Sequence, residues 1–470
     1  MIEYLKMIKS YGDHCMVKML DGEKYTQKSY ADYYRDIRTS AQKLENILGE
    51  VRDKHIGILG SNDYEYMVLM AAIMLSRAVM VPLNNRESSD NLIAAIKRSD
   101  LDLIIIWETD LQLFNEELVT VVYKKDFFDN YYVEKELTDF TDAEESRTAS
   151  IIFTSGSTGL AKGVELSVGS FFGKLKNNMP KTYANISEAP LDSVAYINIP
   201  FYHIGGIMPW LNWTEYGCTI AISVDAKNLF YDLENNKIQF AAVTPVVLKL
   251  WCKCIKKRKL DRLGGVKYIY VGGATVNPEL IGVFISEGIT LIQLYGMTET
   301  GGDIAVNYDM VHHGDSVGKA ADGVDILIID GEICVKSNNN MKGYYNNPEE
   351  TIKVKNDGII YTGDLGYVDE ERYVYITGRK KNLIILSGGE NVSPEEIENE
   401  LYKNMHISEC KVYEQNDRIA AEIFAPSALE GEIKQYIDTI NTNFPIYKRI
   451  YIVIFRETEF EKTAIGKIKR

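Results

Sequence analysis

The sequence is poor in cysteine and histidine, with only six of each among its 470 residues. The cysteines are too few and too scattered to cross-link a chain of this length, so we expect reduced thiols and a cytoplasmic protein. Cys252 and Cys254 have the spacing of a metal-ligand pair. No second Cys/His pair lies near them, and we therefore expect two ordinary thiols on a helix.

Long hydrophobic runs are also missing. The most apolar stretch, "YMVLMAAIML" at 66–75, is too short to cross a bilayer and predicts a buried helix. The first residues, "MIEYLKMIKSYGDH", lack the apolar region and cleavage pattern of a secretory signal, so we expect none. A formal net charge of -15 repels phosphate backbones and argues against a nucleic-acid partner, although a nucleotide could still be bound locally.

What the sequence does contain is an alternation of strands and helices. From residue 54 the apolar runs "HIGILG", "VMVPLN" and "LDLIIIW" predict strands, and the segments between them predict helices, the first capped by Ser61, Asn62 or Asp63. Strands that are apolar throughout indicate a parallel sheet covered on both faces. The order returns after Ile151 as strand, glycine loop and helix, and again in "SVAYINIPF", "FAAVTPVVLKLW", "VKYIYVGGA" and "GITLIQLYG".

The pattern changes near residue 315, where short strands with tight turns begin, including a hairpin that turns at 369–372. Further on, "SPEEIENEL" has the signature of a helix start with Ser393 as its cap. We expect an α/β fold: a large N-terminal domain of parallel α/β sheets with a small β-barrel-like subdomain, then a small mobile α+β domain. The predicted boundaries are 1–378 for the core, 379–382 for a hinge and 383–470 for the C-terminal domain.

The stretch "IIFTSGSTGLAKGVELS" at 151–167 places a loop rich in glycine and hydroxyl groups directly after an apolar strand. Successive backbone N–H groups of such a loop converge on an anion, and Lys162 adds a positive charge. The loop is not a Walker A motif, because no GK[ST] closes it at the required spacing. The pattern favours a phosphate-binding loop, and a polar turn between two elements is the alternative.

The segments "YGMTETGG", "YTGDLGYVDE", "GRKKNLIILSGGENVSPEEIE" and "KTAIGKIKR" follow this loop in that order. From about residue 150 to its end, the sequence resembles the adenylate-forming superfamily of acyl- and aryl-CoA ligases, peptide-synthetase adenylation domains and beetle luciferases. The resemblance implies that ATP and Mg²⁺ activate a carboxylic acid as an acyl-adenylate with release of pyrophosphate. The acyl group then passes to a thiol, here that of coenzyme A.

The resemblance also implies roles for individual residues. Thr298 matches the threonine that binds the α-phosphate, Glu299 the acid that holds Mg²⁺, and Asp364 the acid that binds the ribose hydroxyls. The same matching assigns ATP or AMP binding to Thr154, Ser155, Gly156, Ser157, Thr158, Gly159, Lys162, Gly272, Gly273, Ala274, Tyr295, Gly296, Met297, Asp364 and Arg379.

Two further roles concern the C-terminal domain. Lys467 matches the lysine that bridges the substrate carboxylate and the α-phosphate, and Lys381 occupies the hinge position about which this domain turns. After that turn, Gly388 and Gly389 of "LSGGEN" would line a channel for pantetheine.

The stretch "IPFYHIGG" narrows the range of carboxylic acids that the enzyme is expected to use. Where amino-acid-activating relatives carry an aspartate, this chain has His203, so an amino acid is disfavoured, and the resemblance gives this histidine the role of a gate. The motifs are closest to acyl- and aryl-CoA ligases of the o-succinylbenzoate and benzoate type. We expect an acyl pocket formed by His203, Thr244, Thr300, Gly301 and Gly302, which does not distinguish fatty from aromatic acids.

The chain departs from the family pattern at Ala161, where proline is usual, and at 383–385, where some relatives carry a second lysine. Because the chain stops three residues after Lys467, we expect a stand-alone enzyme with no fused carrier domain. One alternative is an enzyme that loads a separate acyl carrier protein. Another is a non-catalytic nucleotide sensor, which should have lost Lys467, Glu299 or Asp364. The oligomeric state stays open.

Overall fold

The computed structural model describes residues 1–21, 24–107, 119–129, 144–154, 161–172, 191, 193–223, 226–273, 276, 278–461 and 468. The predicted site residues at 155–159, with Ala274 and Lys467, lie outside the described residues. Among the described residues, no helix has the length and hydropathy needed to span a membrane.

The first sheet has seven strands in the order β18-β8-β7-β4-β3-β5-β6. The five strands from β7 to β6 are parallel, as the apolar runs predict, and β8 and β18 add an antiparallel edge. The strands are β3 (His55–Leu59), β4 (Val79–Leu83), β5 (Leu103–Ile106), β6 (Thr120–Tyr123), β7 (Thr148–Thr154), β8 (Lys162–Ser167) and β18 (Gly343–Tyr344).

One expectation about this sheet is wrong. The glycine loop was predicted to lead from a strand into a helix, whereas it joins β7 to the antiparallel strand β8, and the short helix α6 (Val168–Phe172) comes only afterwards. Buried Val164 and Leu166 of β8 belong to the hydrophobic core. The strand is further held on its other side by β18, a partner from much later in the chain.

The second sheet has nine strands in the order β15-β14-β13-β12-β11-β9-β10-β1-β2. Its six central strands are parallel, and antiparallel strands close both edges. The strands are β1 (Cys15–Asp21), β2 (Lys24–Ser29), β9 (Val194–Ile197), β10 (Thr219–Ser223), β11 (Phe240–Val243), β12 (Tyr268–Gly272), β13 (Thr290–Met297), β14 (Gly302–Asn307) and β15 (Lys319–Ala320).

Helices from the first half of the chain fill the space between the two sheets. All residues of α3 (Tyr64–Leu75) except Glu65 are buried, which confirms the buried helix predicted there. They share one hydrophobic core with residues of both sheets. The other helices of this larger unit are α1 (Ile2–Ser10), α2 (Tyr30–Leu48), α4 (Ser89–Arg98), α5 (Lys124–Phe128), α8 (Ile204–Glu215), α9 (Leu229–Glu234), α10 (Pro245–Lys256), α11 (Pro278–Ile285) and α12 (Pro348–Val354).

A third sheet, which is antiparallel, forms the small β subdomain that the sequence led us to expect. It consists of β16 (Val324–Ile329), β17 (Glu332–Ser337), β19 (Lys355–Asn356), β20 (Ile359–Val368) and β21 (Val374–Arg379). The predicted hairpin is confirmed, because β20 and β21 pair antiparallel across a turn in which Arg372 has a φ of 69°.

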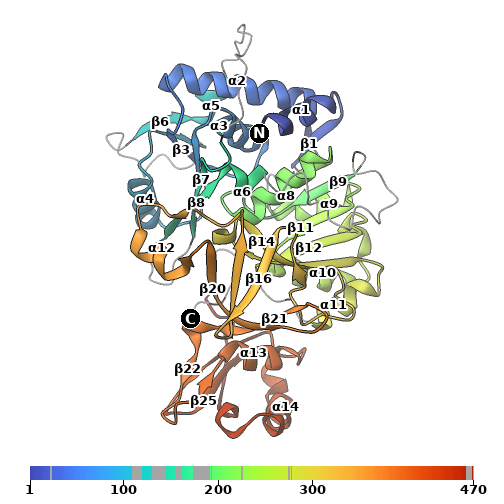
Figure 1. Ribbon diagram of the computed structural model, residues 1–470. Coiled ribbons are helices and arrows are strands. Elements are labelled where there is room, and N and C mark those ends of the chain that lie inside the picture. The colour runs from blue at the N-terminus through green and yellow to red at the C-terminus, as the bar shows by residue number, and fades with distance from the viewer. Residues whose placement is uncertain are drawn as a thin grey trace.

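The C-terminal segment forms a smaller α+β unit with its own hydrophobic core, below the larger unit in Figure 1. It contains β22 (Ile384–Ile385), β23 (Asn391–Val392), α13 (Pro394–Tyr402), β24 (Glu409–Glu414), β25 (Ile419–Phe424), α14 (Glu430–Asn443) and β26 (Ile450–Arg456). Ser393 caps α13 as predicted, since its side chain accepts a hydrogen bond from Glu396 N. The exact boundaries of 1–378, 379–382 and 383–470 remain predictions.

Candidate active site

A cavity of about 1440 Å³ opens where the carboxyl ends of β11, β12 and β13 meet α8 and the antiparallel subdomain. This volume exceeds the roughly 300–1,000 Å³ of most single-ligand pockets, so it has room for two ligands side by side. Its lining brings together most of the described residues that the sequence predicts for the site: Thr154, Lys162, His203, Thr244, Gly272, Gly273, Gly296, Met297, Thr298, Glu299, Gly302, Arg379 and Lys381.

Six described residues of the predicted site do not line the cavity: Tyr295, Thr300, Gly301, Asp364, Gly388 and Gly389. Thr300 is buried, and its hydroxyl is bonded to the carbonyl groups of Met297 and Gly302 at 3.0 and 2.8 Å. Gly301 has a φ of 66°, and a Cβ there would lie 2.4 Å from a backbone oxygen. Both residues shape the turn rather than line the acyl pocket. Gly388 and Gly389 lie in the C-terminal unit, between β22 and β23.

Asp364 lies directly behind Arg379, which lines the subdomain end of the cavity. Its side chain is nearly fully buried, and both of its oxygens are engaged. Arg379 Nε lies 2.5 Å from Oδ1, and the Tyr295 hydroxyl donates a 2.7 Å hydrogen bond to Oδ2. Burial, followed by the Asp364 charge, holds the pKa of Tyr295 well above its usual value, so this phenol stays a donor. A carboxylate oriented in this way suits the two hydroxyls of a ribose.

The segment after Arg379 is held by ion pairs on the same subdomain. Lys380 Nζ lies 2.9 Å from Oε2 of buried Glu332, whose other oxygen accepts a hydrogen bond from Gly363 N at 2.8 Å. Asn382 donates a 2.5 Å hydrogen bond to Glu395 of α13. The predicted hinge therefore contacts both the subdomain and the C-terminal unit, and any rotation there must exchange these contacts.

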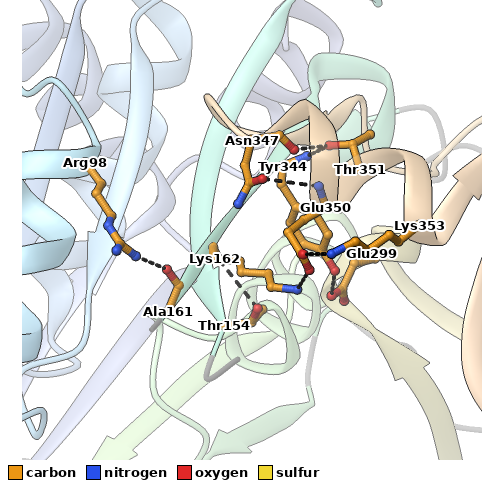
Figure 2. Close-up of polar contacts among 10 residues, drawn as sticks. All are labelled: Arg98, Thr154, Ala161, Lys162, Glu299, Tyr344, Asn347, Glu350, Thr351 and Lys353. Carbon is orange, nitrogen blue, oxygen red and sulfur yellow. Dashed lines mark hydrogen bonds and ion pairs between the residues drawn. The ribbon is translucent and has the colours of Figure 1, made fainter. Parts of the chain in front are cut away.

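Glu299 stands in the short turn after β13 with its side chain largely buried. The Tyr344 hydroxyl donates a 2.8 Å hydrogen bond to Oε1, as Figure 2 shows. Glu299 also lines the cavity. Among the described residues no cluster of three potential metal ligands exists. A single carboxylate nevertheless fits Mg²⁺, which uses one or two protein carboxylates and takes its other ligands from phosphates and water.

Lys162 begins β8, directly after the glycine loop, and its ammonium group is mostly shielded from solvent. It lies 2.5 Å from Oε2 of Glu350 in α12 and 5.0 Å from the centre of the Tyr344 ring. Figure 2 shows the ammonium group between Glu350 and the Thr154 end of β7. The cation predicted to meet the phosphates of ATP is thus placed beside the candidate Mg²⁺ ligand.

The opposite end of the cavity is mostly apolar and is formed by α8 against β11, β12 and β13. The Trp213 and Tyr270 rings meet edge to face, with centroids 5.8 Å apart. Aromatic rings of this kind bury large apolar areas and offer ring or chain ligands an apolar contact. The residues on this side are Ile199, Ile204, Gly205, Met208, Pro209, Asn212, Trp213, Ala242, Tyr270 and Leu294.

His203 stands between the two ends, at the N-cap of α8. Its Nε2 is buried without a hydrogen-bond partner among the described residues. Burial, with a smaller contribution from the positive charge of Arg86, lowers the pKa of His203 from 6.5 to about 4. The imidazole is therefore neutral at physiological pH and offers a hydrogen bond, not a charge, to a ligand.

The loop that carries His203 is held by a residue whose role the sequence did not predict. Asn62 donates a 2.9 Å hydrogen bond to the carbonyl of Ile199 and accepts a 2.8 Å hydrogen bond from Phe201 N. From the sequence, Asn62 was expected only as one of three possible helix caps, whereas Asp63 is the residue that caps α3. The contact spans more than a hundred positions, and no local pattern indicates it.

Comparison with known proteins gives one family and a consistent set of relatives. The family model of the AMP-binding enzymes matches residues 8–345. The 2-succinylbenzoate–CoA ligase of Listeria innocua is 28% identical over 94% of this chain and 93% of its own. The indoleacetate–CoA ligase of Aromatoleum aromaticum is 30% identical over 68% of this chain and 65% of its own.

Solved structures agree on the fold. The O-succinylbenzoate coenzyme A synthetase of Bacillus subtilis in complex with AMP superimposes with a TM-score of 0.83 at 21% identity, covering 99% of this chain and 96% of its own. The anthranilate–CoA ligase AuaEII in complex with anthranoyl-AMP also gives a TM-score of 0.83, at 18% identity, covering 99% of this chain and 95% of its own.

Proposed function

Because the chain belongs to the AMP-binding enzyme family, we propose that it joins an aromatic carboxylic acid to coenzyme A, with 2-succinylbenzoate as the first acid to test. The general activity is that of an ATP-dependent acid–thiol ligase, which forms an acyl-adenylate and then a thioester. ATP and coenzyme A are its co-substrates, and Mg²⁺ is its metal ion.

The observation that carries this proposal is that one cavity joins a polar, charged end to an apolar end. Lys162, Glu299 and Arg379 line the first, whereas Trp213 and Tyr270 line the second. A nucleotide and an acid bound at the two ends would meet beside Thr298 and His203. This is the arrangement that acid activation requires.

The chemistry follows from the charges. A carboxylate oxygen attacks the α-phosphorus of ATP, the bond to the β-phosphate oxygen breaks, and pyrophosphate leaves with the bonding pair. Two anions must meet, so oriented positive charge has to offset their repulsion. Lys162 supplies charge towards the leaving pyrophosphate, and Thr298 donates to the α-phosphate. When bound at Glu299, Mg²⁺ adds positive charge at the phosphate oxygens.

Neutral His203 lies where the acid enters, and its unpartnered Nε2 is suited to donate a hydrogen bond to the carboxylate. A neutral donor orients the nucleophilic oxygen, whereas a charged imidazolium would form a tight ion pair with the carboxylate and weaken it as a nucleophile. This supports the role of a gate and positioning group for the acid.

The C-terminal unit completes the proposal. Lys467 would bridge the carboxylate and the α-phosphate in the first step. Rotation about Lys381 would then withdraw it and bring Gly388 and Gly389 towards the cavity for pantetheine. The contacts of Lys380 with Glu332 and of Asn382 with Glu395 lie on either side of that pivot. Cytoplasmic location also remains a prediction.

Among acids, an aromatic one is favoured by the Trp213 and Tyr270 rings at the apolar end of the cavity and by the relatives named for 2-succinylbenzoate and indoleacetate. The test is a pyrophosphate-release screen of 2-succinylbenzoate, indoleacetate, benzoate and dodecanoate, with the thioester product identified by mass spectrometry. We expect the highest kcat/KM for an aryl acid. A clear preference for dodecanoate would contradict the aromatic assignment.

The same assay separates the two possible acceptors. Coenzyme A and a phosphopantetheinyl carrier protein are offered together, and the acylated product is identified. Acylation of coenzyme A is expected. Acylation of the carrier alone would favour the enzyme that loads a carrier protein.

A further inference from the structure

One short segment contacts both Lys162 and Glu299, the residues predicted to bind the phosphates of ATP and Mg²⁺. This segment, "GYYNNPEETIKV" at 343–354, comprises β18 and α12. Its Glu350 contacts Lys162, and its Tyr344 contacts Glu299. In Figure 2 the two contacts lie next to each other, with Tyr344 between the cation and the carboxylate.

The segment is fixed to the strand that carries Lys162. β18 pairs antiparallel with β8, with Tyr344 opposite Val164, and Tyr345 N donates a 2.7 Å hydrogen bond to Gly163 O. Figure 1 shows α12, in orange, beside β8, although the chain between them is long. The backbone that carries Tyr344 therefore has a fixed position relative to Lys162.

The start of α12 is equally well fixed. The Asn347 side chain accepts a 3.2 Å hydrogen bond from Glu350 N, which caps the helix. The Thr351 hydroxyl donates to Asn347 O and accepts from Tyr344 N, both at 2.8 Å. These bonds join the strand to the helix, so Glu350 and Tyr344 act as parts of one rigid support.

Lysine side chains have several rotatable bonds and lose much freedom when they are held in one position. Lys162 is held by a 2.5 Å ion pair to Glu350 and by the face of the Tyr344 ring. An ammonium group has three N–H donors, so it keeps one bond to Glu350 while offering others to phosphate. Glu350 also forms an ion pair with Lys353, which offsets the repulsion its charge would exert on a phosphate.

We propose that Glu350 and Tyr344 are positioning residues for the adenylation step: Glu350 holds the Lys162 ammonium group towards the phosphates of ATP, and Tyr344 orients the Glu299 carboxylate for Mg²⁺. The inference rests on the proposed function, which makes Lys162 and Glu299 ligands of ATP and the metal. The alternative is that Glu350 is a latch that competes with ATP for Lys162.

The two possibilities predict opposite changes in the Kd of ATP when Glu350 is replaced. A positioning residue should raise the Kd when it is lost, and a latch should lower it. The Kd of ATP is measured by calorimetry with saturating Mg²⁺ and no acid, for the wild type and for Glu350→Gln. We expect a rise of about three- to tenfold, within the usual range for contacting residues. Glu349→Gln, its exposed neighbour on the same helix turn, is the matched control and is expected to leave the Kd unchanged. An unchanged or lower Kd in Glu350→Gln would overturn the proposal.

A double-mutant cycle shows whether Glu350 acts through Lys162. In a Lys162→Met background, Glu350→Gln is expected to change the Kd of ATP less than about twofold. A similar rise in both backgrounds would overturn the proposal, because a merely structural loss does not depend on the lysine. Far-UV circular dichroism of each variant identifies any that fail to fold. The Tyr344 variant then provides the independent test.

Tyr344→Phe keeps the ring and removes only the hydroxyl bonded to Glu299. We expect a several-fold rise in the Mg²⁺ concentration for half-maximal ATP binding, with little change at saturating Mg²⁺. Tyr345→Phe, which loses a 2.9 Å bond to Asp100, is the control. An unchanged Mg²⁺ midpoint in Tyr344→Phe would overturn this half of the proposal. None of these measurements needs the acid, so absence of pyrophosphate release in the wild type would refute the proposed function separately.

Discussion

The guanidinium group of Arg379 and the carboxylate of Asp364 form an ion pair with 2.5 Å between Nε and Oδ1. The pair links the last residue of β21 to the middle of β20, at the edge of the cavity and next to the predicted hinge. A ribose bound at Asp364 would share or replace these contacts. The pair therefore couples the nucleotide end of the cavity to the segment that leads into the C-terminal unit.

Asp364→Asn tests the ribose role. The amide keeps the volume of the side chain but has only one acceptor oxygen and no charge. Since hydrogen bonds to charged groups contribute about 1.5–3 kcal/mol, the KM of ATP should rise about ten- to a hundredfold. The KM of the acid should change little. Asp325→Asn, at an exposed position of β16, is the control, and an unchanged KM of ATP in Asp364→Asn would contradict the assignment.

Lys467→Ala tests the division of work between the two steps. Loss of one donor to the developing charge is expected to slow adenylation about 10²- to 10³-fold. Thioester formation from supplied acyl-adenylate should remain near the wild-type rate, because the proposed rotation would by then have withdrawn Lys467. Lys469→Ala serves as the control. Equal loss of both half-reactions would count against a rotation between them.

Substitutions at the adjacent glycines Gly205 and Gly206, at the start of α8, are expected to have opposite effects. A Cβ on Gly205 would meet nothing closer than Ile199 Cγ2 at 3.8 Å, and Gly205 lines the acid end of the cavity. Gly205→Leu should therefore fold and raise the KM of an aryl acid roughly tenfold or more by overfilling the pocket. The KM of ATP should be unaffected. If the KM of the acid does not change, the acid does not bind along α8.

Gly206 is the structural counterpart. A Cβ there would lie 2.3 Å from the carbonyl oxygen of Pro200, a backbone atom that also accepts a 3.1 Å hydrogen bond from His203 N. Gly206→Ala should lower the unfolding temperature, whereas Gly205→Ala should not. Equal thermal stability of the two alanine variants would show that the turn before α8 is less tightly packed than the structure indicates.

The protonation of His203 gives a pH prediction. Burial places its pKa at about 4 in place of 6.5. As the pH falls from about 6.5 towards 4, the unfolded chain takes up this proton first, so the folded state loses stability over that interval and not above it. In NMR spectra of ¹³C-histidine-labelled protein, the signal absent from His203→Gln should not shift between pH 8 and 5.5. A midpoint near 6.5 would contradict a buried, neutral imidazole.

Much of the fold follows from local sequence. Apolar runs predicted β3, β4 and β5 with parallel pairing, and the turn at 369–372 predicted the hairpin of β20 and β21. These elements were predictable because a buried parallel strand needs apolar residues on both faces. A tight hairpin needs turn-forming residues such as Asp369, whose side chain accepts a 2.8 Å hydrogen bond from Tyr373 N.

The rest depended on contacts between distant positions. A helix was expected directly after the glycine loop. The strand β8 was not predicted, because one of its partner strands, β18, comes from the far end of the larger unit. Glu350 lies 188 positions from Lys162, and Asn62 lies 139 positions from Phe201. Family motifs indicated Lys162, Glu299 and Asp364, but not the residues that hold them. Thr300 and Gly301 belong to the motif, and only the structure shows that they form its turn.

The central claim is that a carboxylate oxygen of the acid attacks the α-phosphorus of ATP. The most direct test uses 2-succinylbenzoate, or the best acid of the screen, labelled with ¹⁸O in the reacting carboxylate. After turnover with ATP, Mg²⁺ and coenzyme A, the account predicts AMP that carries one ¹⁸O atom and pyrophosphate that carries none. Label in pyrophosphate or phosphate, or its absence from AMP after thioester has formed, would contradict the account.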